Sequence, residues 1–497
     1  MIRRAAVALA AATLLFGRQI ASWSVSENRY LYPWQRRDGL YLIAAVLLTG
    51  LLALLLDRAC GGLGGPRLRR VLRLGFALAL GQILVGLVLA PDAEKPFEGG
   101  ILASLVVAGA TLYWFRRAET RVVRVAVTTA LLAVPLGPIL FVQILSWKSW
   151  PQCGPPKPGP DPVAGARPVY VLLFDEWSLA RSQRGGEFLP ELANLRRLAE
   201  RSAVFTEARA PGDATQKSIP RLLYQENGEV VAGNGRALWR VGDSAGPATG
   251  RPNLFRLARA RGYRTEAAGW YLPYAALVGE DLDGCRAWSQ LPKREGPARL
   301  FDLLWANFRY LPDPLSRALW RALYARWFGA DWYALERRIE AEAMRVARES
   351  PANTLAFVHF PLPHAPFVFQ ADGRYGGPFR DGRMFGTPEE YGRQIRYLDV
   401  VLGRFLDTLE AAGRLDSALI VVTSDHSWKK DPDKRELVRE RLRRVPLVVK
   451  WPGQREGVVV REEWCQLALG GLIGRALAGE TSPHRSTPEE GARCAAP

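Results

Sequence analysis

Histidine and cysteine are scarce in this sequence, which has four histidines and five cysteines among 497 residues. Acidic residues are also few relative to basic ones, and the formal net charge is +18. No block of basic residues interleaved with aromatic residues accompanies this charge, so the sequence does not indicate a nucleic-acid binder. Proximity to anionic lipid explains the excess of arginine better, although an arginine-rich proteome would also be sufficient.

Charged residues are absent from four long stretches in the first 147 residues. Each stretch has 17 to 23 residues, enough for a helix to cross a hydrocarbon core of roughly 30 Å. These stretches are Gly39–Leu56, Leu74–Pro91, Gly99–Phe115 and Val125–Trp147. A shorter run, Ala5–Gly17, could be a further span or a signal peptide. The spans lack ionisable residues, which argues against a transporter.

Arginine placement predicts the orientation of these spans. The connections 57–73 and 116–124 are rich in arginine, whereas the connection 92–98 is acidic. Because cytoplasmic loops carry the excess of basic residues, everything after Trp147 is predicted to lie outside the cytoplasm. The predicted location is therefore the cell inner membrane, with several spans and a soluble domain on the periplasmic or extracellular side.

We expect four segments along the chain. A transmembrane region of four or five helices covers residues 1–147, and a Pro-rich linker follows over 148–168 as a stiff spacer. The soluble domain covers 169–480, and a polar tail covers 481–497. Four cysteines lie on the outer side, where disulfides are permitted, but their pairing is left open: Cys153, Cys285, Cys465 and Cys494.

Continuous apolar runs in the soluble part predict strands buried on both faces. They are found in Val169–Ser178, Thr354–Phe367, Leu419–Trp428 and Arg444–Gly453. Segments with helical periodicity lie between them, such as Tyr391–Leu415. This alternation predicts an α/β domain with a mostly parallel central sheet covered by helices.

Acidic residues and histidines follow three of these runs. In α/β folds, functional sites gather beyond the carboxyl ends of the strands. Carboxylates and imidazoles together could hold a divalent metal ion, although an isolated acidic pair is more often a capped turn or a surface ion pair, and spacing alone does not show convergence. The candidates are Asp175, Glu176, His359, His364, Asp425 and His426.

The order of these motifs resembles the alkaline phosphatase/sulfatase superfamily over roughly residues 168–455. The matching pieces are "VLLFDEWS", "ATQKSIPRLL", "HFPLPHAPF", "TSDHSW" and "RVPLVVKWPG". Membrane spans followed by an outer domain also resemble the phosphoethanolamine and phosphoglycerol transferases of this superfamily. The resemblance implies an alkaline-phosphatase-like fold and a metal-dependent enzyme.

The resemblance also implies roles for single residues. Asp175, Glu176, Asp425 and His426 would hold one divalent metal ion together with Thr215, with zinc and manganese preferred and magnesium and calcium left open. Thr215 would be the nucleophile, although a threonine there could be a plain helix N-cap. His364 would bind or protonate the oxyanion or leaving group, and His359 would contact substrate or be structural. Lys429 and Lys430 would neutralise substrate charge or be solvated loop lysines.

Two departures from the sulfatase pattern favour phosphorus chemistry. Formylglycine formation needs Cys or Ser in a C/S-x-P-x-R context, and the sequence here reads Thr-Gln-Lys-Ser-Ile. The segment Ala268–Pro273, "AGWYLP", lacks the lysine and histidine of the sulfatase "GKWH"-like segment. We therefore predict a phospho-group transferase or hydrolase that acts on a lipid- or glycan-linked phosphoester.

The predicted partners follow from that reaction. They are a membrane lipid as donor or substrate and an envelope glycan or small molecule as acceptor, with no nucleic acid. The alternatives are a sulfuric or phosphoric ester hydrolase and a non-catalytic envelope assembly factor on the same fold. The aromatic segment Phe301–Arg348 is predicted to form core helices or a surface that dips into the outer leaflet.

Overall fold

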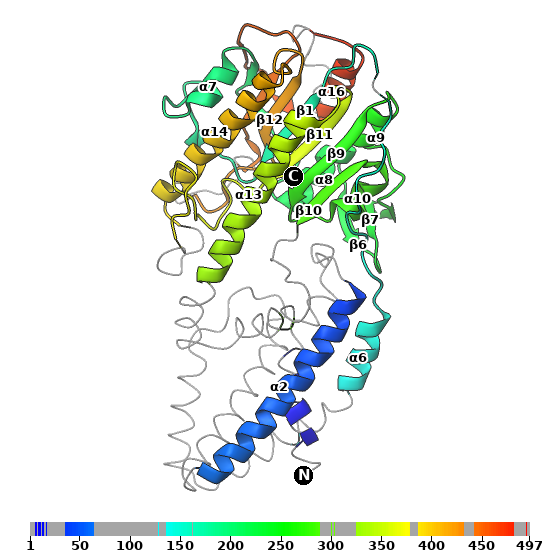
Figure 1. Ribbon diagram of the computed structural model, residues 1–497. Helices are drawn as coiled ribbons and strands as arrows, with labels where there is room; N and C mark the ends of the chain where they lie inside the picture. The colour runs from blue at the N-terminus through cyan, green and yellow to red at the C-terminus, as the bar shows by residue number, and fades with distance from the viewer. Residues whose placement is uncertain are drawn as a thin grey trace. The chain divides into compact units, whose positions relative to one another are not determined.

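The structure is a computed structural model, drawn in Figure 1. It describes residues 35–63, 136–161, 163–288, 325–377, 386–431 and 442–481, together with Cys494 and a few other isolated positions. The chain divides into two compact units. The first consists of residues 1–150 and 293–324, and the second of residues 151–292 and 325–497.

Two apolar helices are described in the first unit, α2 (Arg36–Leu63) and α6 (Leu136–Ser146). Within the described residues, one stretch is long and apolar enough to cross a membrane, Arg36–Leu55 in α2. Helix α2 contains the first predicted span, Gly39–Leu56. Helix α6 falls inside the fourth, and the second and third lie outside the described residues, as do several positions of Ala5–Gly17. The bundle of four or five helices therefore stays a prediction.

The second unit is built on an eight-stranded sheet in the order β10-β9-β11-β1-β12-β13-β4-β14. The first five of these strands are parallel to one another, whereas β13 runs antiparallel to both of its neighbours. Their bounds, in sheet order, are Gly284–Trp288, Arg264–Trp270, Thr354–Phe360, Val169–Phe174, Leu419–Ser424, Leu447–Lys450, Ala203–Phe205 and Val458–Val460. The predicted α/β domain with a mostly parallel sheet is confirmed.

Helices cover both faces of this sheet. Figure 1 shows α7, α13 and α14 on one side and α8, α9 and α16 on the other. These helices are α7 (Ala193–Ala199), α13 (Ala325–Glu349), α14 (Pro388–Ala411), α8 (Thr215–Tyr224), α9 (Leu254–Arg259) and α16 (Leu469–Leu477). Short helix α10 (Tyr274–Val278) follows β9. The remaining strands pair among themselves: β2 (Gln183–Arg184) with β3 (Glu187–Phe188), β5 (Ala208–Arg209) with β15 (Trp464–Cys465), and β6 (Glu229–Ala232) with β7 (Ala237–Val241) and β8 (Ser244–Pro247).

Local sequence explains why the longest covering helix begins where it does. Thr387 caps α14 by accepting from Glu390 N, and the Glu390 side chain accepts from Thr387 N in return. Pro388 occupies the first turn, where its missing N–H is harmless. The inner face of the helix then buries leucine, valine and phenylalanine side chains, each worth about 1.5–3 kcal/mol.

The Pro-rich segment is attached to the soluble domain. Cys153 forms a disulfide with Cys285 of β10. Lys157 N donates to Asp283 O at 2.7 Å, and Asn353 Nδ2 donates to Asp161 O at 3.0 Å. Residues 153–161 of the predicted spacer therefore lie against the soluble domain and are attached to it by these contacts.

Helix α13 falls within the segment that was predicted as core helices or as a leaflet-dipping surface. Phe328, Trp332, Leu335 and Ile339 are buried on its inner face, and the helix packs on α14 and β11. The described part is therefore a covering helix of the domain. Most of residues 301–324 lie outside the described part of the chain.

Glu336 on α13 is a buried acid whose replacement should stabilise the fold. It is fully buried, and neither carboxyl oxygen has a hydrogen-bond partner among the described residues. Burial, with the charge of Glu340, raises the pKa of Glu336 well above its usual value, against the effect of Arg337. We expect Glu336→Met to raise the free energy of unfolding by about 1–3 kcal/mol at pH 8, because it removes a buried polar group without a partner.

The increase in the free energy of unfolding that Glu336→Met causes should be smaller at pH 5 than at pH 8. A raised folded-state pKa means that the folded protein holds a proton which the unfolded chain releases above its ordinary pKa. The free energy of unfolding of the wild type, relative to that of Glu336→Met, therefore falls as the pH rises above the pKa of glutamate in the unfolded chain. Denaturant unfolding of both proteins at the two pH values checks this, with the exposed Glu349→Met as control. Destabilisation by Glu336→Met at both pH values would contradict it.

Candidate active site

The sheet register brings the predicted metal-binding residues to one edge. Phe174, the last residue of β1, lies opposite Ser424, the last residue of β12. The residues that follow, Asp175 and Asp425, therefore leave neighbouring parallel strands side by side. β11 flanks β1 on its other side and carries His359 next to its last residue. This is the carboxyl-end edge at which α/β folds place their sites.

Three of these side chains form a group that could hold a metal ion. One ligand atom from each of Asp175, Asp425 and His426 lies within 4.8 Å of the other two, and all three residues are buried. Asp175 Oδ1, Asp425 Oδ2 and Glu176 Oε2 have no hydrogen-bond partner among the described residues. Buried carboxylate oxygens are almost always paired, so these orphaned atoms fit a cation as their partner.

The donor set fits a divalent ion of intermediate hardness. It combines carboxylate oxygens with one imidazole nitrogen, the mixture that zinc and manganese accept. His426 Nδ1 lies 2.9 Å from Ser427 O, which assigns the ring proton to Nδ1 and leaves Nε2 as the free ligand atom. Burial, together with the charge of Asp425, raises the pKa of Asp175 to about 8. Such repulsion between two buried carboxylates is relieved by a cation.

Glu176 has an unusual backbone conformation beside this group. Its φ is 61°, in the left-handed region that costs a non-glycine residue roughly 1–2 kcal/mol. Glu176 N donates to Asp425 Oδ1 at 3.1 Å, and Glu176 O accepts from Tyr391 Oη at 2.6 Å. The turn after β1 is thus fixed by the second carboxylate and by α14.

Thr215, the predicted nucleophile, lies at the same centre. It is the first residue of α8, and its Oγ1 lies 3.3 Å from His426 Nε2, which is itself 3.3 Å from Asp425 Oδ2. Ala214 is the N-cap, and no side chain caps the helix. The hydroxyl is therefore turned to the carboxylate and histidine group, and the plain N-cap interpretation does not describe it.

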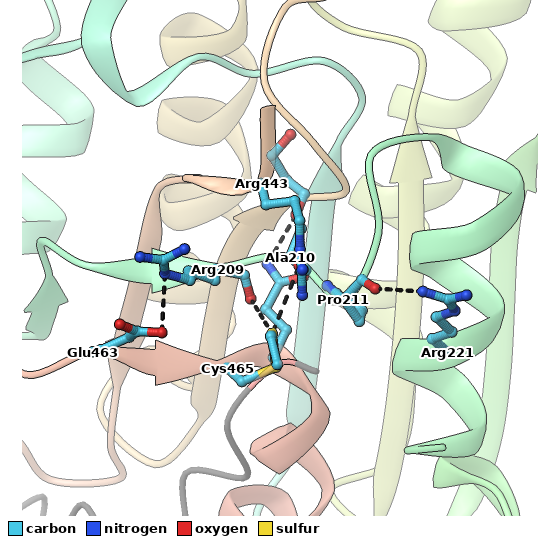
Figure 2. Close-up of a disulfide and its surroundings, with 10 residues drawn as sticks. Arg209, Ala210, Pro211, Arg221, Arg443, Glu463 and Cys465 are labelled. Carbon is cyan, nitrogen blue, oxygen red and sulfur yellow. Dashed lines mark hydrogen bonds and ion pairs between the residues drawn. A yellow bond between two sulfur atoms is a disulfide. The ribbon is translucent and has the colours of Figure 1, made fainter. Parts of the chain in front are cut away.

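The loop before Thr215 is held by contacts from three directions, shown in Figure 2. Arg443 Nε donates to Ala210 O at 3.0 Å, and Arg221 Nη1 donates to Pro211 O at 2.8 Å. The disulfide between Cys465 and Cys494 lies against β5, with Cys494 Sγ 3.6 Å from Arg209 O and 3.7 Å from Ala210 O. A cysteine 284 positions further along the chain than Ala210 thus contacts the loop before Thr215.

Removing this disulfide should lower turnover more than it lowers substrate affinity. A displaced nucleophile loses rate steeply with distance, so we expect Cys465→Ser with Cys494→Ser to reduce kcat about tenfold and to leave KM within about twofold. The matched control is Cys153→Ser with Cys285→Ser, which removes the disulfide of the Pro-rich segment. Both pairs should lose stability, by about 2–4 kcal/mol. An equal kcat for the two double variants would contradict the positioning role.

His359 is engaged by protein groups on both ring nitrogens. Nε2 lies 3.3 Å from Asp175 Oδ2, and Nδ1 lies 2.9 Å from Tyr274 Oη. Burial lowers the pKa of His359 to about 4, so the ring is neutral. This geometry favours the structural alternative, in which His359 orients Asp175. Sequence reasoning missed Tyr274, for which the only available signal was its place just after "AGWYLP".

His364 lies partly exposed in the loop after β11, within the electrostatic reach of the acidic residues. Burial acts against ionisation, but the carboxylates of Glu176 and Asp175 raise the pKa of His364 above its usual value. Its Nδ1 lies 2.6 Å from Ala365 O, which leaves Nε2 for a ligand. A histidine held in this way can donate a proton to a leaving oxygen.

The two lysines after His426 differ in position. Lys429 is half-buried. Burial raises the pKa of Asp213, but the hydrogen-bonded Lys217 and, more weakly, Lys429 lower it overall, so Lys429 lies near the loop before Thr215. Lys430 is exposed. The structure thus brings together Asp175, Glu176, Thr215, Asp425 and His426, sets His359 and His364 beside them, and places Lys429 at the margin.

No curated protein matches the chain. Similar solved structures include the C-terminal periplasmic domain of EptC from Escherichia coli in complex with zinc, at 12% identity over 68% of this chain and 90% of that chain, with a TM-score of 0.40. The lipoteichoic acid synthase LtaP from Listeria monocytogenes is 13% identical over 65% of this chain and 77% of that chain, with a TM-score of 0.41. At these scores neither similarity bears on the reaction.

The family assignment depends on a different comparison. The model of the sulfatase family matches residues 169–463, which is more than half of the chain and contains every candidate residue described above. The match begins at the first residue of β1 and includes the whole edge at which the acidic residues and histidines meet. The chain therefore belongs to the sulfatase family.

Proposed function

We propose that this protein is a membrane-anchored, metal-dependent phospho-group transferase or hydrolase that acts outside the cytoplasm through Thr215. The observation that carries the proposal is the 3.3 Å separation of Thr215 Oγ1 from His426 Nε2, inside the group formed by Asp175, Asp425 and His426. A hydroxyl so close to candidate metal ligands is suited to nucleophilic attack. Its place at the start of α8 also favours an approaching anion.

The chain's own residues supply the steps. Asp175, Glu176, Asp425 and His426 would hold a divalent ion, which stabilises negative charge on the attacking and leaving oxygens when bound. Thr215 Oγ1, after losing its proton to solvent, forms a bond to phosphorus as the bond to the leaving oxygen breaks, and His364 Nε2 gives that oxygen a proton. An acceptor hydroxyl or water then attacks phosphorus, returns a proton to His364 and releases Thr215.

Phosphorus chemistry is favoured over sulfate-ester chemistry by the nucleophile itself. The family's formylglycine arises from Cys or Ser, and this chain has Thr215 at that position. Among the residues that the structure describes, the candidate metal group consists of Asp175, Asp425 and His426 and includes no cysteine. A sulfuric ester hydrolase of the usual kind is therefore the weaker alternative.

Two features support membrane anchoring with an outer domain. Leucines along α2 are about half exposed, including Leu47, Leu51 and Leu55, which suits a helix in contact with lipid. The second unit contains two disulfides, which persist in oxidising compartments. The proposed donor is a membrane lipid, and the proposed acceptor is an envelope glycan or a small molecule.

The proposal is tested with the full chain purified in detergent. We expect about one divalent ion per chain by elemental analysis, turnover of p-nitrophenyl phosphoesters but not of p-nitrophenyl sulfate, and a phosphorylated Thr215 peptide by mass spectrometry after rapid quenching. Turnover without any modified Thr215 would remove the covalent route. Absence of both metal and turnover would favour a non-catalytic envelope factor.

A further inference from the structure

Three loops of the candidate site meet at one residue of α14, Tyr391. This residue is fully buried, and its backbone N donates to O of the N-cap residue Thr387 at 2.9 Å, which ties it to the capped first turn of the helix. Its hydroxyl bonds to the loop after β1, and its ring contacts the loops after β11 and β12. One side chain of a covering helix therefore joins the segments that carry the candidate residues.

The hydroxyl of Tyr391 closes the turn that carries two of the candidate metal ligands. It donates to Glu176 O at 2.6 Å and accepts from Ser178 N at 2.9 Å. Glu176 has a φ of 61°, and a residue other than glycine keeps such a conformation only where its surroundings hold it. The two hydrogen bonds are contacts of this kind, so the hydroxyl helps to fix the direction in which Asp175 and Glu176 leave β1.

The ring of Tyr391 packs on the loop that carries the other two ligands. Trp428, which follows closely after His426, is fully buried and stacks on this ring, with the centroids 4.1 Å apart and the planes at 5°. Phe367, from the loop after β11, completes the cluster at 5.7 Å from Tyr391 and 5.9 Å from Trp428. Because aromatic pairs stabilise beyond the area that they bury, the ring attaches the His426 loop to the helix that also holds the Glu176 turn.

We propose that Tyr391 is a positioning residue for the divalent ion, which holds the turn after β1 and the loop after β12 at the separation that the ion requires. The inference rests on the proposed function through the metal ion alone. The carboxylate oxygens of the candidate group that have no hydrogen-bond partner among the described residues come from these two segments. Because buried carboxylates repel each other, two unattached segments would move apart before an ion arrives. A preorganised site loses less freedom on binding, so the link through Tyr391 raises the affinity for the ion.

The variant Tyr391→Phe tests the hydroxyl. Phenylalanine keeps the ring on Trp428 and removes both hydrogen bonds to the Glu176 turn. The probe is zinc ion, which a site of carboxylates and imidazole binds more tightly than it binds manganese. Competition with a zinc chelator, on the full chain in detergent after removal of metal, measures affinity without any turnover. We expect Tyr391→Phe to weaken zinc binding by about tenfold to a hundredfold.

The matched control is Tyr397→Phe on the same helix. Tyr397 is also fully buried, its ring stacks on Phe369, and its hydroxyl donates to Glu340 Oε2 at 2.8 Å and accepts from Arg337 Nη1 at 2.9 Å. The control thus loses two hydrogen bonds of the same kind, and none of them involves a candidate metal ligand. Both variants should lower the urea midpoint of the metal-free protein, but Tyr397→Phe should keep its zinc affinity within about threefold of wild type.

Two variants of Trp428 test the ring. Trp428→Phe keeps an aromatic ring against Tyr391, so its zinc affinity should stay within about threefold of wild type. Trp428→Leu removes the stacked pair and should weaken zinc binding by about tenfold. Rescue by the conservative variant is expected only if the ring contact itself supports the ion. An equal affinity in the two Trp428 variants would therefore overturn the role of the ring.

The same measurements separate failure of the positioning role from failure of the proposed function. Equal zinc affinity in wild type and Tyr391→Phe, or an equal loss in Tyr391→Phe and Tyr397→Phe, would overturn the positioning role and leave the proposed reaction in place. Zinc binding that depends on the Tyr391 hydroxyl, without turnover of any phosphoester, would retain the positioning role and remove the reaction. Absence of zinc binding by the wild type would overturn both.

Discussion

Replacing Asp425 by asparagine is expected to remove the metal ion and to lower kcat/KM for a phosphoester by about a thousandfold or more. Asp425 lies at the centre of the candidate group, since it neighbours His426 at 3.3 Å and accepts from Glu176 N at 3.1 Å and from its own neighbour His426 N at 2.8 Å. Asparagine keeps the shape and one accepting oxygen but removes the charge that attracts the cation. Elemental analysis and steady-state kinetics on the same preparation measure both effects.

The matched control is Asp399→Asn. Asp399 is also buried, and its carboxylate accepts from Leu195 N at 2.7 Å and from Asn194 N at 3.2 Å at the start of α7. This variant should lose about 1 kcal/mol of stability, as when a helix cap is weakened, and keep its metal. A full equivalent of metal in Asp425→Asn would contradict the assigned site.

Replacing Thr215 by valine should lower turnover about as much as Asp425→Asn does, but it should leave the metal content unchanged. Valine keeps the branched shape and removes the hydroxyl, so the covalent intermediate cannot form and kcat should fall by about a thousandfold or more. The other four proposed ligands remain, and the metal content should therefore stay near that of the wild type. Rapid-quench detection of the phosphorylated peptide, together with elemental analysis, distinguishes this outcome from loss of the metal.

Ser218 provides the control for the nucleophile. It lies one turn after Thr215 on α8, is buried, and its Oγ has no hydrogen-bond partner among the described residues. Ser218→Ala should keep activity within about threefold of wild type. If Ser218→Ala were inactive and Thr215→Val active, the hydroxyl would have been assigned to the wrong residue.

Buried parallel strands were the part of the fold most accessible to sequence reasoning. The runs that form β1, β11 and β12 are buried at every position because helices cover both faces, and this leaves a nearly continuous apolar pattern in the sequence. Since parallel strands end at the same edge, the acidic residues and His426 after them could be expected to meet. The antiparallel direction of β13 left no such trace, because a strand buried at all four positions has the same burial pattern in either direction.

Contacts that depend on side chains from distant segments were not accessible. Tyr274 is an aromatic residue of the kind that fills any core, and only the fold shows that its hydroxyl lies 2.9 Å from His359 Nδ1. Disulfide pairing was also open, because four cysteines permit three pairings. Attachment of the Pro-rich segment depends on the disulfide of Cys153, whose pairing was open, and on the hydrogen bond from Lys157 N to Asp283 O, for which side-chain identity gives no signal.

The two carboxylates of the candidate metal group are neighbours in the sheet but lie 250 positions apart in the chain, at Asp175 and Asp425. A nascent polypeptide that has emerged as far as β11 already contains Asp175, Thr215 and His359, yet it lacks Asp425 and His426. Ribosome stalling or proteolytic clipping before Leu419 would therefore yield fragments without the second half of the candidate site, and the site would be complete only after synthesis had passed His426.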